Sequence, residues 1–255
     1  MTTEAAGRSS PCRDVVLLHG WGMAKSVWRE VSRLLSTHCR VTALDLPGYG
    51  ASDSCRPYTL ERITEQLAVQ APQRCAVVGW SLGGQIALHW ARQCPEQVNR
   101  IGLVAATPRF VTGLDWPHGV EARVLDDFRA SLRAHPEDTL ARFALLQAQG
   151  DRAARDVARQ LRAHAIRPED SMRATLEDGL ANLRDNDLRE QLKAVTQPAL
   201  VLQGEEDALV PPSVAEYLSA ALPHARLVTL PGVAHAPLVS VPGAVAHELL
   251  VFLHE

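Results

Sequence analysis

No stretch of this 255-residue chain reaches the roughly 18 consecutive apolar residues that a membrane-spanning helix needs. The opening segment, 1–13, is polar and lacks the apolar run of a secretory signal. The formal net charge is -3, so the basic excess that is typical of nucleic-acid-binding proteins is also missing. From these absences we expect a soluble cytoplasmic protein that binds neither membrane nor nucleic acid, and whose first residues form an untethered end.

Cysteine and lysine are scarce. The five cysteines are odd in number and include no C-x-x-C pair, which argues against a disulfide framework and against a zinc site. Because histidine and cysteine show no metal-ligand spacing, we expect no metal and no organic cofactor. Lysine occurs only at Lys25 and Lys193, so nearly all positive charge is carried by arginine. The cysteines, which we expect to be reduced, are Cys12, Cys39, Cys55, Cys75 and Cys94.

What the chain does have is an alternation of apolar runs and helical patterns. With 46% hydrophobic residues it can bury the core of one α/β domain that carries an insertion. Continuous apolar runs are typical of parallel strands buried on both faces, so the alternation predicts a mostly parallel sheet flanked by helices. We predict strands at 15–18, 41–46, 75–78, 101–105, 199–202 and 226–230, and helices at 28–35, 60–70, 82–94 and 243–254.

The alternation breaks between residues 109 and 192. This segment is poor in strands, rich in arginine and alanine, and helical in pattern. A helical block between two sheet-forming parts predicts a cap over the carboxyl edge of the sheet. We therefore expect a core made of residues 1–108 and 193–255, with a helical cap inserted at 109–192.

The third predicted strand leads directly into Gly79-Trp80-Ser81-Leu82-Gly83, and a predicted helix follows. Alone, such a G-x-S-x-G match could be a plain loop, but a strand before it and a helix after it are the context in which the motif holds a nucleophile. A strained turn there would present the Ser81 hydroxyl to a base, and the two glycines would let backbones pass close by. Ser81 is therefore the candidate nucleophile.

A serine nucleophile needs a base and an acid, and both follow strand ends later in the chain. Asp207 and His235 come shortly after the last two predicted strands. Serine, aspartate and then histidine is one of the known chain orders of a catalytic triad. We predict that Ser81 attacks, His235 carries the proton and Asp207 orients the imidazole. Glu205 and Glu206 remain alternatives to Asp207, because neighbouring positions on a turn can exchange this role.

The loop after the first predicted strand reads His19-Gly20-Trp21-Gly22. Loops at the carboxyl ends of buried strands are where α/β sheets place ligand chemistry. We expect the backbone N–H groups of Trp21 and Leu82 to form an oxyanion hole, and His19 to shape the loop.

Together these motifs resemble the α/β-hydrolase superfamily. Within it, Trp21 after His-Gly and Trp80 before the serine are similar to the pimeloyl-acyl-carrier-protein methyl ester esterases of biotin synthesis. The resemblance runs from about residue 14 to the C-terminus. The segments that carry it are His19–Gly22, Asp45–Ser52, Gly79–Gly84, Gly204–Asp207 and Ala234–Pro237, and in the expected cap Asp115–Pro117, Arg142–Gln147 and Asp187–Arg189.

The resemblance implies a serine carboxylesterase that hydrolyses the methyl ester of a pimeloyl chain on acyl carrier protein, through an acyl-enzyme. It implies a substrate site that combines core and cap residues, namely Trp21, Ser81, Leu82, His235, Phe143, Ala144, Leu145, Leu146 and Gln147. We expect the enzyme to act as a monomer without a cofactor.

The resemblance also implies that Arg142, Arg155 and Arg159 bind the acidic carrier protein. From the residues alone, Arg152, Arg155, Arg159 and Arg162 are spaced three, four and three apart and so share one helix face. Arginine pairs well with phosphate and carboxylate, although a stripe of charge is also what a solvated helix face shows.

Two features depart from the family pattern. Residues 135–138 read His-Pro-Glu-Asp where the family has a further cap arginine, and segment 1–13 shows no counterpart of the family's first strand. Two alternatives stay open, namely a carboxylesterase that acts on free short-chain esters without a protein partner, and a non-catalytic ligand-binding protein. Ser81 argues against the relatives that use an aspartate nucleophile.

Overall fold

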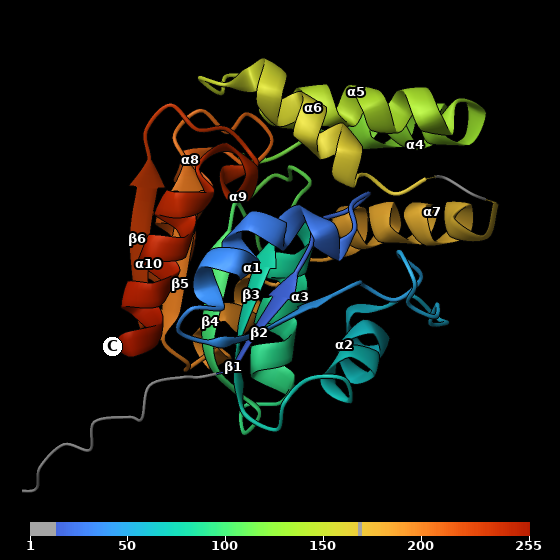
Figure 1. The fold of residues 1–255 in the computed structure, drawn as a ribbon. Coiled ribbons are helices and arrows are strands. Elements are labelled where there is room, and N and C mark those ends of the chain that lie inside the picture. The colour runs from blue at the N-terminus through green and yellow to red at the C-terminus, as the bar shows by residue number, and fades with distance from the viewer. Residues whose placement is uncertain (1–13, 168–169) are drawn as a thin grey trace, which may run out of the picture.

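The computed structural model describes residues 14–167 and 170–255. The untethered end and missing first strand expected within 1–13 therefore lie outside the described residues. Six parallel strands form one sheet in the order β2-β1-β3-β4-β5-β6, as the alternation predicted (Figure 1). The strands are β1 (Asp14–Leu18), β2 (Arg40–Leu44), β3 (Cys75–Trp80), β4 (Val98–Val104), β5 (Ala199–Gly204) and β6 (Ala225–Leu230).

Each of the six predicted strands is present, with ends shifted by a few residues. Strand β2 ends at Leu44 and not at Leu46, because the Leu46 N–H donates to His19 Nε2 at 3.0 Å and leaves the strand ladder. Strand β3 continues through Trp80, directly up to Ser81. Strands β3 and β5 are buried along their whole length, since helices cover both faces of the sheet.

Helix α2 buries one apolar stripe against the sheet. In α2, Thr59 caps the first turn by accepting from the Arg62 N–H at 3.3 Å, and Leu60, Ile63 and Leu67 face the sheet. Helices α2, α3 and α8 pack on one face of the sheet, and α1, α9 and α10 pack on the other. The flanking helices are η1 (Lys25–Trp28), α1 (Arg29–Leu35), α2 (Leu60–Ala68), α3 (Leu82–Gln93), η2 (Arg189–Ala194), α8 (Pro212–Ala221), α9 (Pro237–Ser240) and α10 (Pro242–His254).

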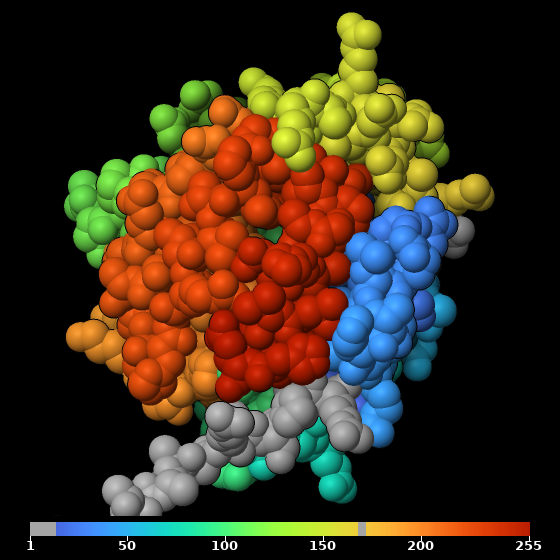
Figure 2. Space-filling model, turned by 60° about the vertical axis from the view of Figure 1, so that its left-hand side comes forward, coloured from blue at the N-terminus to red at the C-terminus, as the bar shows by residue number. Residues whose placement is uncertain are grey.

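Between β4 and β5 the described residues form four α-helices, which we call the helical insertion (α4–α7), and then the 3-10 helix η2. They confirm the helical pattern expected between residues 109 and 192. Helices α4, α5 and α6 lie beyond the carboxyl ends of the strands (Figure 1), and in Figure 2 the yellow part of the insertion sits against the red C-terminal part of the chain. The four helices are α4 (Ala122–Ala134), α5 (Pro136–Ala148), α6 (Ala154–His164) and α7 (Asp170–Asp185).

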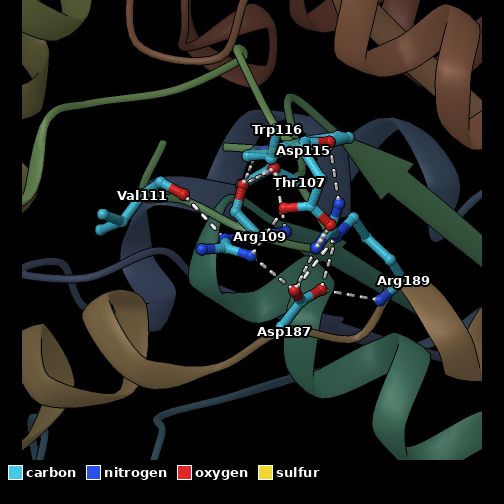
Figure 3. A network of polar contacts seen from close by, with 7 residues as sticks. All are labelled: Thr107, Arg109, Val111, Asp115, Trp116, Asp187 and Arg189. Carbon is cyan, nitrogen blue, oxygen red and sulfur yellow. Dashed lines mark hydrogen bonds and ion pairs between the residues drawn. The ribbon is translucent and has the colours of Figure 1, made fainter. Parts of the chain in front are cut away.

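An ion-pair network joins the two chain segments that connect the insertion to the sheet (Figure 3). Arg189 Nη2 lies 2.8 Å from Asp115 Oδ2 and 2.7 Å from Asp187 Oδ2. From the first segment, Arg109 Nη1 reaches Asp187 Oδ2 at 2.9 Å, and the Trp116 indole N–H donates to the Arg109 carbonyl at 3.0 Å. The hydrogen bonds from Arg189 hold the pKa of the Asp187 carboxyl below its usual value. The beginning and the end of the insertion are thus tied together beside β4.

Candidate active site

Ser81 sits on a strained turn between β3 and α3. Its backbone has φ 55° and ψ -117°, outside the regions that non-glycine residues normally occupy. The turn is so tight that a Cβ placed on Gly79 would lie 2.0 Å from the Gly83 carbonyl oxygen. The chain therefore needs glycine at Gly79, and Ser81 lies directly after the carboxyl end of β3, the context that the motif requires.

The loop that carries Trp21 lies directly beside Ser81. A Cβ built on Gly20 would be 3.2 Å from the Ser81 Cβ, so this loop and the turn are in van der Waals contact. The Trp21 side chain is buried, and its indole N–H donates to the Leu176 carbonyl at 2.9 Å. Leu82 is the first residue of α3, where unpaired backbone N–H groups and the helix dipole favour negative charge. Trp21 thus lies in the loop beside Ser81 and Leu82 follows the serine directly, and the oxyanion hole formed by their N–H groups stays a prediction.

Asp207 and His235 meet after the ends of β5 and β6. His235 Nδ1 lies 2.8 Å from Asp207 Oδ2, and both side chains are buried. The carboxylate also accepts the backbone N–H groups of Leu209 and Val210, each at 2.9 Å, and the Gln203 amide at 3.0 Å. An ionised carboxylate only accepts hydrogen bonds, so His235 Nδ1 carries a hydrogen and Nε2 is left to accept a proton.

Burial and hydrogen bonds distinguish Asp207 from the two neighbouring carboxylates. Glu205 and Glu206 are exposed, and Glu205 Oε2 accepts from the Gly232 N–H at 3.3 Å. Of these three described carboxylates, Asp207 is the one that bonds to the His235 ring. The structure therefore pairs His235 with Asp207 and not with either glutamate, while Ser81 follows the end of the neighbouring strand β3.

The backbone of His235 is held from both sides. The indole N–H of Trp80 donates to the His235 carbonyl at 2.7 Å, and the His235 N–H donates to the Gln147 carbonyl of helix α5 at 3.2 Å. In the sequence, the family resemblance alone indicates a role for Trp80 and Gln147, and the spacing of residues along the chain predicts neither contact. Trp80 thus links the turn at Ser81 to the loop between β6 and α9 (residues 231–236), which we call the histidine loop.

His19 shapes its loop, as predicted. Its Nδ1 donates to the Gly20 carbonyl at 2.8 Å, and its Nε2 accepts from the Leu46 N–H at 3.0 Å. These two bonds require the neutral ring. Burial lowers the pKa of His19 to about 4, although the Asp45 carboxylate, 4.0 Å away, acts in the opposite direction.

An apolar cavity of about 210 Å³ lies between the core and the helical insertion. The Trp21 ring forms part of its wall and makes edge-to-face contacts with Phe128 and Phe143, at ring-centroid distances of 5.5 and 5.2 Å. The wall holds no polar residue type. Its lining is Trp21, Phe110, Val120, Val124, Leu125, Phe128, Phe143, Leu146, Leu180, Leu183 and Leu209.

The five substrate residues expected on α5 have different surroundings. Phe143 and Leu146 line the apolar cavity, and Gln147 contacts the histidine loop through its carbonyl. Ala144 is fully buried in the hydrophobic core, and Leu145 lines an outer groove of about 450 Å³ instead of the cavity. Sequence reasoning could not separate them, because five consecutive helical residues point in all directions around the axis.

The predicted carrier-protein arginines lie on the outer surface of the insertion. Arg142 is exposed on α5, and Arg155 and Arg159 are exposed on α6. Arg142 lines the outer groove together with Arg162. Arg159 also pairs with Asp156 at 3.0 Å, a contact that solvent largely screens.

In the described ranges 14–167 and 170–255, no helix combines the length and apolarity needed to cross a membrane. The same ranges contain no group of three or more histidine, cysteine or acidic side chains arranged to hold a metal ion.

Comparison with known proteins places this arrangement in a class. A family model for the alpha/beta hydrolase fold matches residues 15–240. The fold is similar to that of an esterase from Exiguobacterium antarcticum, with a TM-score of 0.83, 22% identity and coverage of 95% of this chain and 92% of that chain. A hydrolase from Pseudomonas aeruginosa PA01 superimposes with a TM-score of 0.78 at 27% identity, covering 96% and 91% of the two chains. The chain belongs to the α/β-hydrolase family.

Its sequence relatives are more specific. The chain is 42% identical to a pimeloyl-acyl-carrier-protein methyl ester esterase of Nitrosomonas europaea, over 90% of this chain and 91% of the relative. It is 38% identical to the protein of the same name in Pectobacterium atrosepticum, over 98% and 96% of the two chains. Within the α/β-hydrolases, the chain belongs to the family of these esterases.

Proposed function

We propose that the protein is a serine carboxylesterase that removes the methyl ester from pimeloyl-acyl carrier protein in biotin synthesis. The observations that support this most directly are the strained turn at Ser81 and the contact between His235 and Asp207 at the carboxyl edge of the sheet. Ser81 occupies the strained turn, and His235 Nδ1 lies 2.8 Å from Asp207 Oδ2. The family of the relatives supplies the substrate.

In the proposed mechanism Ser81 Oγ attacks the ester carbonyl carbon while His235 Nε2 takes the hydroxyl proton. The carbonyl oxygen becomes an oxyanion, which the backbone N–H groups of Trp21 and Leu82 stabilise. His235 then returns the proton to the departing methoxide, so that methanol leaves and an acyl-enzyme remains. Asp207 keeps the imidazole oriented and stabilises its positive charge.

Water then hydrolyses the acyl-enzyme, and His235 again acts first as base and then as acid. His235 Nε2 takes a proton from the water as its oxygen attacks the acyl-enzyme carbonyl. Collapse of the second oxyanion breaks the bond to Ser81 Oγ, which recovers a proton from His235. The products are a free carboxylate and the regenerated enzyme, and no cofactor takes part.

The apolar cavity supports a substrate with a methylene chain. Its wall includes Trp21 and Phe143, offers no polar group, and adjoins the loop beside Ser81. Burial of methylene groups there is favourable by about 0.8 kcal/mol each. We propose that the pimeloyl chain occupies this cavity, with the helical segment 109–192 acting as a cap over the core formed by 1–108 and 193–255.

We further propose that the exposed arginines of the cap dock the carrier protein. Arg142, Arg155 and Arg159 present positive charge on two adjacent helices, and acyl carrier protein is acidic. We also propose that the protein acts as a cytoplasmic monomer.

The test compares two methyl esters, pimeloyl-acyl carrier protein methyl ester and free dimethyl pimelate, with methanol release as the readout. We expect hydrolysis of both, with the higher kcat/KM for the carrier-bound ester. Ser81→Ala should fold and lose about 10⁴–10⁶ of the rate on both. Equal kcat/KM for the two esters would instead favour an esterase of free short-chain esters. Activity retained in Ser81→Ala would refute the serine mechanism, and failure of the wild-type gene to complement a biotin-requiring strain that lacks this step would refute the pathway role.

A further inference from the structure

A carboxylate of the helical insertion is buried against the loop that carries His235. Asp151 lies between α5 and α6, and its side chain is 6% exposed. Asp151 Oδ2 accepts from the Ala234 N–H at 3.0 Å, and Oδ1 accepts from the Ser240 hydroxyl at 2.9 Å and from the Ala153 N–H at 2.8 Å. Three donors from two parts of the chain therefore converge on one carboxylate.

The Asp151 contacts belong to a longer seam between the insertion and the histidine loop. The Arg152 N–H donates to the Gly232 carbonyl at 3.0 Å, and the His235 N–H donates to the Gln147 carbonyl at 3.2 Å. Figure 2 shows this region of the insertion, in yellow, resting on the red C-terminal segment. Within the seam, Asp151 provides the side-chain contacts, whereas the other two bonds are made by backbone groups.

Only part of the histidine loop is held by the core. Trp80 holds the His235 carbonyl and Asp207 holds the ring, but the N–H groups of Ala234 and His235 are both directed at the insertion. A displacement of about 1 Å at a catalytic group can cost about 100-fold in rate. The position of the buried His235 imidazole relative to Ser81 therefore depends on the insertion as well as on the sheet.

We propose that Asp151 is a positioning residue for His235, through which the helical insertion sets the place of the catalytic base. The proposal rests on the proposed role of His235 in the esterase reaction. Asp151 touches neither the substrate nor the reacting atoms; it acts through Ala234 and Ser240. The esterase is thus complete only while the insertion is seated against the histidine loop.

An aspartate suits this place better than the amide of the same shape. An ionised carboxylate accepts at both oxygens, whereas an asparagine accepts at one and turns an NH₂ group toward the other donor. Asp151→Asn would therefore set a donor against either the Ala234 N–H or the Ala153 N–H. Asp151→Ala would leave these donors without their acceptor in a buried place.

The kinetic test uses p-nitrophenyl acetate, which is too small to depend on carrier-protein docking. We expect Asp151→Asn to lower kcat by about 10- to 100-fold with KM changed less than about threefold, and Asp151→Ala to lower kcat further. Ser240→Ala, which removes one donor only, should show a smaller loss in kcat. Asp127→Asn, the same change at an exposed carboxylate that pairs with Arg123 on α4, serves as the control and should leave both constants unchanged.

A second readout follows His235 itself. The proton on Nδ1, shared with Asp207, is observed at low field by proton NMR. We expect this resonance to shift or broaden in Asp151→Asn and Ser240→Ala, and to stay sharp in Asp127→Asn and Ser81→Ala. It can be recorded whether or not the wild type hydrolyses an ester, so failure of the proposed function does not hide the outcome for Asp151.

Circular dichroism and thermal unfolding establish that each variant is folded. A folded Asp151→Asn enzyme with kcat within twofold of wild type and an unchanged resonance would overturn the proposal. A rise in KM with unchanged kcat would do the same, since it would mean that Asp151 shapes the substrate cavity. If the Asp151 variants do not fold, Ser240→Ala tests the proposal. A lowered kcat with a shifted or broadened resonance would support it, and wild-type values of both would overturn it.

Discussion

At the scale of single residues, the hydrogen bonds of each side chain in the site restrict it to one chemical role. Asp207 accepts four hydrogen bonds, and only one of them comes from His235. The carboxylate is therefore held in place even before the imidazole binds to it. The neighbouring Glu206 is exposed and has no such environment.

This difference leads to a prediction for two adjacent carboxylates. Asp207→Asn should lower kcat by about 10³–10⁴-fold, because the amide no longer fixes the tautomer or stabilises the imidazolium. Glu206→Gln should retain near wild-type activity. Steady-state kinetics on a free methyl ester check both, and the opposite pattern would move the acid role to Glu206.

A second residue-scale prediction concerns His19 and pH. Burial lowers the pKa of His19 to about 4, below the value of about 6.5 for a free imidazole, while Asp45 and Lys25 act on it in opposite directions. The unfolded chain therefore binds one more proton between these pH values, so the free energy of unfolding falls as the pH drops from about 6.5 toward 4. We expect His19 to account for a loss of roughly 2–3 kcal/mol by pH 4.5.

Urea unfolding of wild type and His19→Asn at pH 7 and pH 4.5 measures this contribution. The variant should be less stable at pH 7 because the Leu46 N–H loses its acceptor, yet its stability should change less between the two pH values. Equal changes in the two proteins would show that His19 does not contribute to the pH dependence.

At the scale of elements, two of the polar clusters around the insertion differ in their chemistry. The seam near His235 is made of hydrogen bonds to backbone groups and to the Ser240 hydroxyl. The other cluster is the ion-pair network of Arg109, Asp115, Asp187 and Arg189, which ties the first and last segments of the insertion together (Figure 3). Arg189 is central because it bonds to both carboxylates and lies 5.3 Å above the Trp116 ring.

Arg189→Ala should therefore destabilise the protein without abolishing its catalytic activity. We expect a loss of about 1–2 kcal/mol in the free energy of unfolding, or roughly 2–6 °C in Tm, because Asp187 loses its main partner. Arg62→Ala removes an exposed pair with Glu65 on α2 and is the matched control, expected within about 0.5 kcal/mol of wild type. Differential scanning calorimetry gives both values, and equal Tm shifts would deny the network a special role.

At the scale of the whole molecule, charge is distributed unevenly over a surface whose net charge is -3. The outer faces of α5 and α6 carry Arg142, Arg155, Arg159 and Arg162, all exposed. Such a field acts on a large acidic partner through encounter and orientation, and it acts little on a small ester at the turn of Ser81.

Reversing the charge of Arg142, Arg155 and Arg159 to glutamate should raise KM for the carrier-bound ester about tenfold or more and leave the free ester unaffected. Raising the salt concentration well above 0.15 M, where the screening length is about 8 Å, should weaken only the carrier-bound reaction. Reversal of Arg29, Arg33 and Arg62, which are exposed on the helices of the core, is the control. Equal losses on both esters would mean that the cap arginines stabilise the insertion and do not dock a partner.

The sequence by itself determined the sheet, its flanking helices and the chain order of the triad. Buried parallel strands need continuous apolar runs, and the turn at Ser81 needs Gly79, so each leaves a local pattern. Helix α8 was not predicted, because its ten residues have neither a strong apolar stripe nor a polar cap. The end of β2 was misplaced for a similar reason, since the bond from Leu46 to His19 joins distant segments.

Tertiary structure alone decided which distant groups meet. Asp151 follows a glycine ahead of a helix and accepts from the Ala153 N–H, a local pattern common at helix starts, and nothing local reveals its bonds to Ala234 and Ser240. The choice of Asp207 over its neighbours likewise depends on which side chain the turn directs at His235. Local patterns are confined to a few consecutive residues, whereas these contacts join positions 28 to 89 residues apart and exist only in the folded chain.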